Sequence, residues 1–181
     1  MIGLTTGRQT NQALNSLLKD LSHAIRKAKV VRRGKSSLED LGRRFFDEAL
    51  DYGIILQRRH GGPGRIDFLR VGAKGLTPVA PSVLLSAVRL RREYQHQGKH
   101  VAQAITCDSR VTQTTQRFAK QLSIILDLPQ LTIPTDLGVR CSFHLSEFRD
   151  GSILLTITSP PGQEDVGPRL LVSRLIWDLH D

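Results

Sequence analysis

The spacing of apolar residues predicts alternating strands and helices in the first part of the chain. An apolar run over 2–6 indicates a strand, and leucines at helical spacing follow a cap at Thr10 or Asn11. A second strand is predicted over 29–32. A second helix is predicted after it, and Ser37 with the acid three residues later fits a capping box at its start.

A hairpin is predicted next, because a buried strand over 54–56 reaches a glycine-rich turn at 61–64 and an alternating strand returns over 65–71. Residues 72–81 are expected to form a loop or an edge segment. Residues 83–94 are expected to form a helix, since their apolar positions recur at roughly helical spacing.

The pattern then restarts after a connector. The elements expected in the second part are a strand over 101–107, a helix over 112–126, a long loop with two prolines, and strands over 139–148, 152–158 and 169–179.

The restart indicates an internal repeat. At an offset of 101 residues, similar residues of the first strand and helix fall on those of the later strand and helix; the pairs include Leu4 with Ile105, Thr5 with Thr106, Leu17 with Phe118, and Leu21 with Leu122. We therefore predict an α/β fold with two similar halves in a pseudo-two-fold relation, in which helices cover a sheet.

Composition limits the kind of protein. The chain has 181 residues, of which 39% are hydrophobic, which is enough for a core. The longest uncharged run, 75–88, is too short for a membrane span. The first residues lack a signal-peptide layout, and two cysteines form no disulfide framework. A soluble cytoplasmic protein is expected.

The charge is concentrated in the first half. The chain carries 26 Lys and Arg against 17 Asp and Glu, a net charge of +9. Residues 1–100 hold 19 basic and 8 acidic residues, whereas residues 101–181 hold 7 and 9. Such an asymmetry is typical of a surface that binds nucleic acid, although it also fits a basic surface that only keeps the protein in solution.

Three stretches together resemble the Brix-domain family of ribosome-biogenesis proteins. They cover residues 5–8 with 31–38, residues 58–66, and residues 164–170, and their order and spacing span almost the whole chain. The chain departs from the family pattern at Gly7, where serine is usual, and in its second half, which has few basic residues.

The resemblance implies a single domain over 1–181, made of a basic half over 1–98 and a second half over 99–181. It looks like a single-domain archaeal member, and each half would resemble the anticodon-binding domain of class IIa aminoacyl-tRNA synthetases. It implies binding to ribosomal RNA during subunit assembly, assembly proteins as possible partners, and no catalytic activity. No membrane and no small-molecule substrate are expected.

Arginines and lysines at two turns are the candidate RNA contacts. One group surrounds Gly34 between a strand and a helix N-terminus, which suits phosphate. The other flanks the glycine turn, where arginine forks match phosphate oxygens. A solvated turn and an ordinary hairpin tip are the alternatives. If both strands belong to one sheet, the groups form one basic surface. The candidates are Arg8, Arg32, Arg33, Lys35, Arg58, Arg59, Arg65 and Arg169; for the last, a structural turn after Pro168 fits equally well.

Nothing in the sequence indicates a catalytic, metal or cofactor site. His96 and His100 stand four apart, but no nearby cysteine or carboxylate completes a ligand set. No phosphate-binding P-loop and no nucleophile elbow occurs. The prediction is therefore a non-enzymatic RNA-binding factor. The alternatives are an RNA-processing or RNA-modifying enzyme and a ribosomal or tRNA-binding protein of similar fold.

Overall fold

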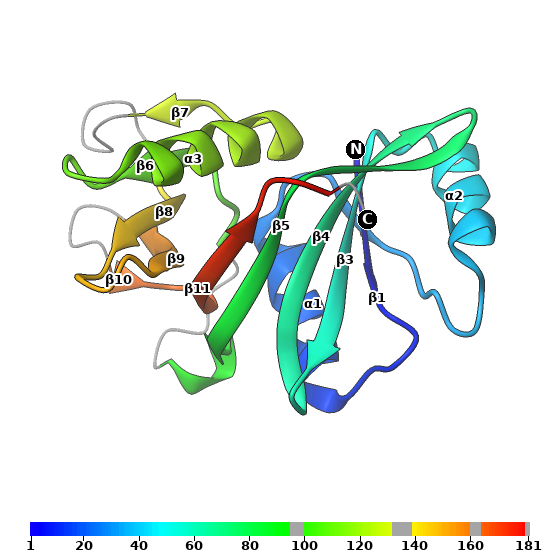
Figure 1. Ribbon diagram of the computed structural model, residues 1–181, viewed down its shortest axis with the longest axis horizontal. Coiled ribbons are helices and arrows are strands. Elements are labelled where there is room, and N and C mark those ends of the chain that lie inside the picture. Colours follow the sequence, from blue (N-terminus) through cyan, green and yellow to red (C-terminus); the bar gives the residue numbers. More distant parts are fainter. Residues whose placement is uncertain (95–99, 132–138, 160–163, 180–181) are drawn as a thin grey trace. The chain divides into compact units, whose positions relative to one another are not determined.

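The computed structural model describes residues 1–94, 100–131, 139–159 and 164–179 (Figure 1). The chain divides into two units. Unit 1 consists of Met1–Ser22, Lys27–Leu85 and Arg174–Asp181, and unit 2 consists of His23–Arg26 and Ser86–Ser173. Helix α1 and strands β5 and β11 each contribute residues to both units, so each unit is assembled from separate pieces of the chain.

In unit 1 the strands follow the order β2-β1-β3-β4-β5. β1 runs parallel to β2 and to β3, whereas β4 is antiparallel to β3 and to β5. Parallel neighbours need crossover connections, and helices provide both of them. The elements are β1 (Ile2–Thr6), α1 (Gln12–Ala24), β2 (Ala28–Val30), α2 (Leu38–Asp47), β3 (Tyr52–Arg59), β4 (Gly62–Gly72) and β5 (Gly75–Arg89).

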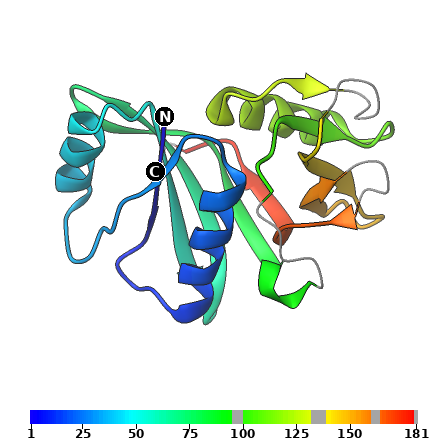
Figure 2. The same cartoon turned by 180° about the vertical axis from the view of Figure 1, so that it is seen from behind.

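The two helices cover opposite faces of these strands. The chain crosses from β1 to β2 on one side and then to β3 on the other, and right-handed crossovers in opposite directions use opposite faces. Figure 2 shows α1 in front of the strands of unit 1. On the other face, Phe45 of α2 is fully buried in a cluster with Leu41, Ile55 and Leu69.

Glycine allows α2 to lie close to the sheet. A Cβ on Gly53 would lie 2.5 Å from the Phe45 ring, and one on Gly3 would lie 2.8 Å from it.

Gly53→Ala should lower the free energy of unfolding by about 1–3 kcal/mol, because a fully buried ring has nowhere to move. Urea denaturation measures it. Gly62→Ala is the control, because no atom of the described residues lies within 4 Å of the added carbon; its free energy of unfolding should stay within about 0.5 kcal/mol of that of the original chain.

Unit 2 repeats the connection order of unit 1. β6 runs parallel to β7 and β8, and β9 is antiparallel to β8 and β11. Helix α3 packs against β6, β7 and β8. The elements are a 3₁₀ turn (Arg91–Glu93), β6 (Ala104–Cys107), α3 (Gln113–Leu126), β7 (Gln130–Leu131), β8 (Ser142–Glu147), β9 (Ile153–Ser159), β10 (Glu164–Asp165) and β11 (Arg169–Ile176).

The offset of 101 residues agrees with the structure. Helices α1 and α3 begin at Gln12 and Gln113, which are 101 positions apart. Several residues paired by the offset are buried in both units: Leu4 with Ile105, Thr5 with Thr106, Leu17 with Phe118, and Leu21 with Leu122. The mixed α/β architecture is confirmed. A two-fold relation between the halves stays a prediction.

The helix predicted over 83–94 is wrong. Residues 75–89 form β5, followed by the 3₁₀ turn, and the expected loop over 72–81 belongs mostly to β4 and β5. Val83 is buried and pairs with Ile66, and Leu84 pairs with Arg65. The hydrogen bonds of this strand come from β4, a distant partner whose presence the local spacing of apolar residues does not reveal.

The predicted capping box at Ser37 is confirmed. The backbone amide of Asp40 donates to Ser37 Oγ at 3.0 Å, and the backbone amide of Ser37 donates to Asp40 Oδ2 at 3.1 Å. Ser37 Oγ also donates to Asp40 Oδ2 at 2.7 Å, and this bond, followed by the one from the Ser37 amide, holds the pKa of Asp40 below its ordinary value. These hydrogen bonds fix the start of α2 directly after the basic loop over 31–35.

Candidate nucleic-acid interface

Seven predicted contact residues come together at one edge of unit 1. β2, β1 and β3 run parallel, so their carboxyl ends meet at the same edge, which also receives the start of the antiparallel β4. This edge lies at the lower end of unit 1 in Figure 1. We call it the basic edge. Its cations are Arg8 after β1, Arg32, Arg33 and Lys35 after β2, Arg58 and Arg59 at the end of β3, and Arg65 in β4.

The hairpin tip between β3 and β4 is tied to the first turn of α1. The side chain of Asn11 donates to the carbonyl oxygen of Gly61 at 2.7 Å and accepts the Leu14 amide at 2.8 Å. Gly61 adopts φ +88°, and a Cβ on Gly64 would lie 2.3 Å from that of Arg59. Glycine is therefore needed at both positions to place the arginines of the tip beside the helix N-terminus.

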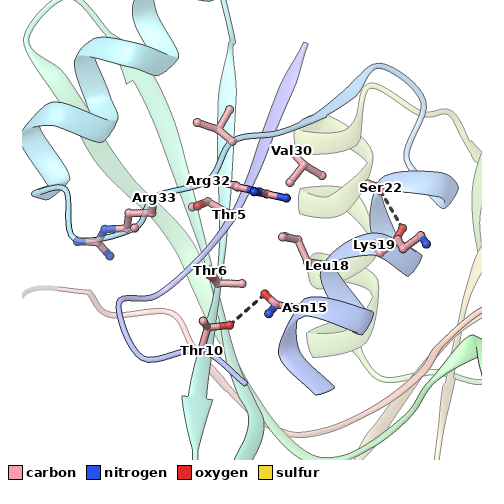
Figure 3. A pocket seen from close by; sticks show the side chains of 12 residues that line it. Thr5, Thr6, Thr10, Asn15, Leu18, Lys19, Ser22, Val30, Arg32 and Arg33 are labelled. Atoms are coloured by element: carbon pink, nitrogen blue, oxygen red, sulfur yellow. Dashed lines mark hydrogen bonds between the residues drawn. The ribbon is translucent and has the colours of Figure 1, made fainter. Parts of the chain in front are cut away.

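A groove of about 540 Å³ runs between β1 and the first turns of α1. Figure 3 shows Arg32 extending across it toward α1, whereas Arg33 points away. Thr5 lines the groove but is fully buried, so it belongs to the floor. We call this the β1–α1 groove; its lining residues also include Thr6, Thr10, Asn15, Leu18 and Val30.

A second groove of about 520 Å³ adjoins the first. It is lined by Arg8 and Lys35, and it shares Thr6, Thr10 and Gly34 with the β1–α1 groove. We call it the Arg8–Lys35 groove. Arg8 and Lys35 are cations, and Thr10 is followed closely by the N-terminus of α1, which is the positive end of the helix dipole. This combination suits the phosphates of a nucleic acid.

Most cations of the basic edge lack a carboxylate partner among the described residues. Arg65 is the exception, since its Nε donates to Asp67 Oδ1 at 2.7 Å and to Ser82 Oγ at 2.9 Å. Arg33 Nε donates to the carbonyl oxygen of Ser36 at 3.2 Å. Burial, and then the positive charge of Arg8, lower the pKa of Arg33. Cations that repel one another in this way favour a bound anion.

A carboxylate stands at the corresponding edge of unit 2. Arg58 lies four residues after Ile54, which pairs with Leu4, and Glu147 lies four residues after Phe143, which pairs with Ile105. The repeat therefore places Arg58 and Glu147 at equivalent positions. Glu147 accepts the backbone amide of Thr112 at 3.0 Å, so a carboxylate of the chain itself occupies the N-terminus of α3.

Because the Glu147 carboxylate accepts hydrogen bonds, we expect the free energy of unfolding to depend on pH. Burial raises the pKa of Glu147, but hydrogen bonds from Thr112 and Thr115 outweigh it and hold the pKa below its ordinary value. Its stabilising effect is therefore complete above about pH 4.3 and is lost as the pH falls through the lower, folded-state pKa. Glu147→Gln should cost about 1 kcal/mol at pH 7. Urea denaturation at several pH values should show the gap closing in acid; a constant gap would contradict the capping role.

A buried polar chain in unit 2 was not foreseen from the sequence. Thr106 Oγ1 lies 3.0 Å from His144 Nδ1 and 3.1 Å from Ser142 Oγ, and His144 Nε2 lies 3.1 Å from Asp108 Oδ1. Hydrolases align a hydroxyl, an imidazole and a carboxylate in this way. Here Thr106 and Ser142 are each 1% exposed, so no substrate reaches the hydroxyls and the chain joins β6 to β8.

The equivalent threonine in unit 1 differs. Thr5 Oγ1 is buried and has no hydrogen-bond partner among the described residues. Thr5 and Thr106 are 101 positions apart, at matching places in β1 and β6. The two units therefore differ at the buried threonine of their first strand. They also differ in the residue beside the N-terminus of their first helix.

Arg169 lies in unit 2 and forms an ion pair with Asp165. Val166 between them donates its amide to the carbonyl oxygen of Ile157 at 2.9 Å, and a Cβ on Gly167 would lie 2.7 Å from Ile157. These contacts favour the structural interpretation of the stretch at 164–170.

Other candidate chemistry is limited. Both cysteines are free, and burial raises the pKa of Cys107 to about 11 and that of Cys141 to about 12, so both are neutral thiols. Among the described residues, no group of three or more His, Cys, Asp or Glu could hold a metal ion; His96 lies outside them. No helix in the described ranges is long and apolar enough to cross a membrane.

Comparisons with known proteins identify the fold. No protein-family model matches the sequence, and no curated protein matches it. The structure is similar to a probable ribosomal biogenesis protein from Aeropyrum pernix K1, with a TM-score of 0.78 and 22% identity over 97% of this chain and 98% of that chain. It is also similar to Mil, an archaeal Imp4-like protein, with a TM-score of 0.69 and 18% identity over 98% of this chain and 100% of that chain. At the level of the fold, the resemblance found in the sequence is confirmed.

Proposed function

We propose that this chain is a non-enzymatic RNA-binding factor in ribosome biogenesis that binds precursor ribosomal RNA during subunit assembly. The observation that carries the proposal is the basic edge of unit 1, where seven cations stand at the strand ends and four of them line two grooves close to the N-terminus of α1; those four are Arg8, Arg32, Arg33 and Lys35. Arginine and lysine at a helix N-terminus bind phosphate whatever the base sequence of the RNA. This is how a protein holds RNA through its backbone. The fold shared with a probable ribosomal biogenesis protein supports the choice of ribosomal RNA.

We further propose membership of the Brix-domain family, with two halves that each resemble an anticodon-binding domain. The repeated connection order of units 1 and 2 supports a duplicated half. The proposal places RNA on the first half and leaves Arg169 of unit 2 as a predicted contact. The contacts to assembly proteins and the cytoplasmic location expected from the sequence are part of the same proposal.

Sedimentation of native extracts tests the biological role. An assembly factor should travel with precursor particles and be missing from mature subunits, whereas a ribosomal protein would stay in mature subunits. A tRNA-binding protein would travel with neither. Crosslinking in the native cell, followed by sequencing of the bound RNA, identifies the RNA directly.

An activity assay tests the enzyme alternative. The purified chain is incubated with ribosomal RNA, magnesium and S-adenosylmethionine, and RNA cleavage and methyl transfer are measured. We expect neither product. Turnover that survives stringent purification and is lost when the basic edge is neutralised would replace the proposal with an RNA-processing or RNA-modifying enzyme.

A further inference from the structure

We propose that the β1–α1 groove holds the base of one unpaired nucleotide and that the Arg8–Lys35 groove holds the phosphate next to it. This inference rests on the proposed RNA-binding function and deepens it, because it specifies single-stranded rather than double-helical RNA. It is carried by the form of the two grooves and the chemistry of their walls.

The size and the walls of the β1–α1 groove suit a base. Its volume of about 540 Å³ lies within the range of small-molecule sites in proteins. Leu18 on α1 and Val30 on β2 provide apolar surface. Figure 3 shows both side chains at the same depression, with Arg32 extending into it. A guanidinium plane can stack on a base. Arg32 therefore supplies a stacking surface in a groove that has no aromatic residue among its described lining residues.

The polar wall can read the edge of a base. Thr10 Oγ1 donates to Asn15 Oδ1 at 3.0 Å, which orients the Asn15 amide. The amide nitrogen of Asn15 makes no hydrogen bond within the described residues and carries two hydrogens. Carbonyl oxygens on the edges of unpaired bases accept such hydrogens. Thr10 and Asn15 are exposed, so an incoming base reaches them without opening the fold.

The phosphate site follows from the shared wall. Thr6, Thr10 and Gly34 line both grooves, so a base in one and a phosphate in the other belong to neighbouring parts of the same strand. Arg8 and Lys35 face that phosphate from the loops that follow β1 and β2.

This arrangement discriminates against a double helix. In A-form RNA the bases are stacked and paired, and their edges lie in grooves that leave no base free to enter a protein depression. A duplex can contact the cations of the basic edge but not fill the β1–α1 groove. The expected result is therefore tighter binding to a single strand than to a duplex at equal salt.

Fluorescence anisotropy with the full chain tests the inference, using a short labelled single strand and the duplex formed with its complement. Failure to bind either RNA would overturn the proposed function itself. Equal affinity for both RNAs would leave that function standing and overturn the nucleotide site. A clear preference for the single strand supports the site.

A matched pair of variants on α1 sharpens the test. Asn15→Leu removes the amide donors at an exposed helical position, and it should weaken single-strand binding about fivefold, the effect of one lost hydrogen bond. Gln12→Leu, on the same helix but outside both grooves, should leave binding unchanged. Equal losses in the two variants would overturn the role of Asn15.

Photocrosslinking gives an answer that does not depend on a variant folding. A single strand that contains 4-thiouridine is bound and irradiated, and the attached peptides are identified by mass spectrometry. The site predicts adducts on residues 5–34, which include the lining of the β1–α1 groove. Adducts confined to the hairpin tip over 58–65 would show that the base lies elsewhere.

Discussion

Replacing Arg58 and Arg59 with alanine should weaken RNA binding to many sequences and flatten its salt dependence. Both are exposed at the end of β3 and have no carboxylate partner among the described residues. Each lost phosphate contact reduces the slope of log K against log salt by about 0.7 for a single strand. About six contacts would give a slope near −4, and the double variant should reduce its magnitude by about one to two units. Titrations at several salt concentrations measure it.

The matched control is the pair Arg110→Ala and Arg149→Ala. Both arginines are exposed in unit 2, and the net charge falls by the same amount in the two double variants. We expect little loss of affinity from the control. Equal losses would mean that the +9 charge attracts RNA as a diffuse field, and the basic edge would not be the binding surface.

Arg58→Glu should have a larger effect on binding than Arg58→Ala while keeping the fold stable. The repeat places Arg58 where unit 2 has Glu147, which caps the N-terminus of α3 with its carboxylate. A carboxylate beside the N-terminus of α1 would interact favourably with the positive end of the helix dipole. The same carboxylate would repel phosphate. Because like charges brought together cost several kcal/mol, affinity should fall by about 100-fold or more.

Two measurements on Arg58→Glu separate these effects. Urea denaturation at pH 7 should give a free energy of unfolding at least equal to that of the original chain, and anisotropy should show the loss of binding. The reverse substitution, Glu147→Arg, should destabilise unit 2 because it removes the carboxylate that accepts the Thr112 amide. Loss of stability in Arg58→Glu would refute the equivalence of the two positions.

Local patterns predicted much of the secondary structure. The strand at β1, the helix α3 and the capping box of α2 follow from residue spacing and side-chain chemistry within a few positions, and these were confirmed. The repeat offset also came from the sequence, because buried positions in the two units carry similar residues. The secondary-structure prediction failed where hydrogen bonds to a strand distant in the sequence determine the conformation. β5 pairs with β4, and its apolar residues happen to recur at helical spacing.

The sequence predicted which residues belong to the candidate site, but it did not predict where they lie together in the fold. Arg32 and Arg58 belong to different turns, and only the parallel order β2-β1-β3 brings their strand ends to one edge. The β1–α1 groove depends on the approach of α1 to β1, and the Arg8–Lys35 groove depends on the approach of residues 34–35 to residues 6–10; no short segment encodes either contact. Residues that signal no function in the sequence, such as Asn15 and Thr5, enter the site only through this packing.

The sequence by itself determined the alternation of strands and helices, the caps, the repeat and the concentration of positive charge in the first half, since each depends on residues near one another or on simple counts. The tertiary structure decided which cations share an edge and which lack a carboxylate partner. It also decided that a carboxylate occupies the helix N-terminus of unit 2, whereas an arginine stands at the equivalent position of unit 1. These are pairings between residues distant along the chain, and sheet order and register establish them.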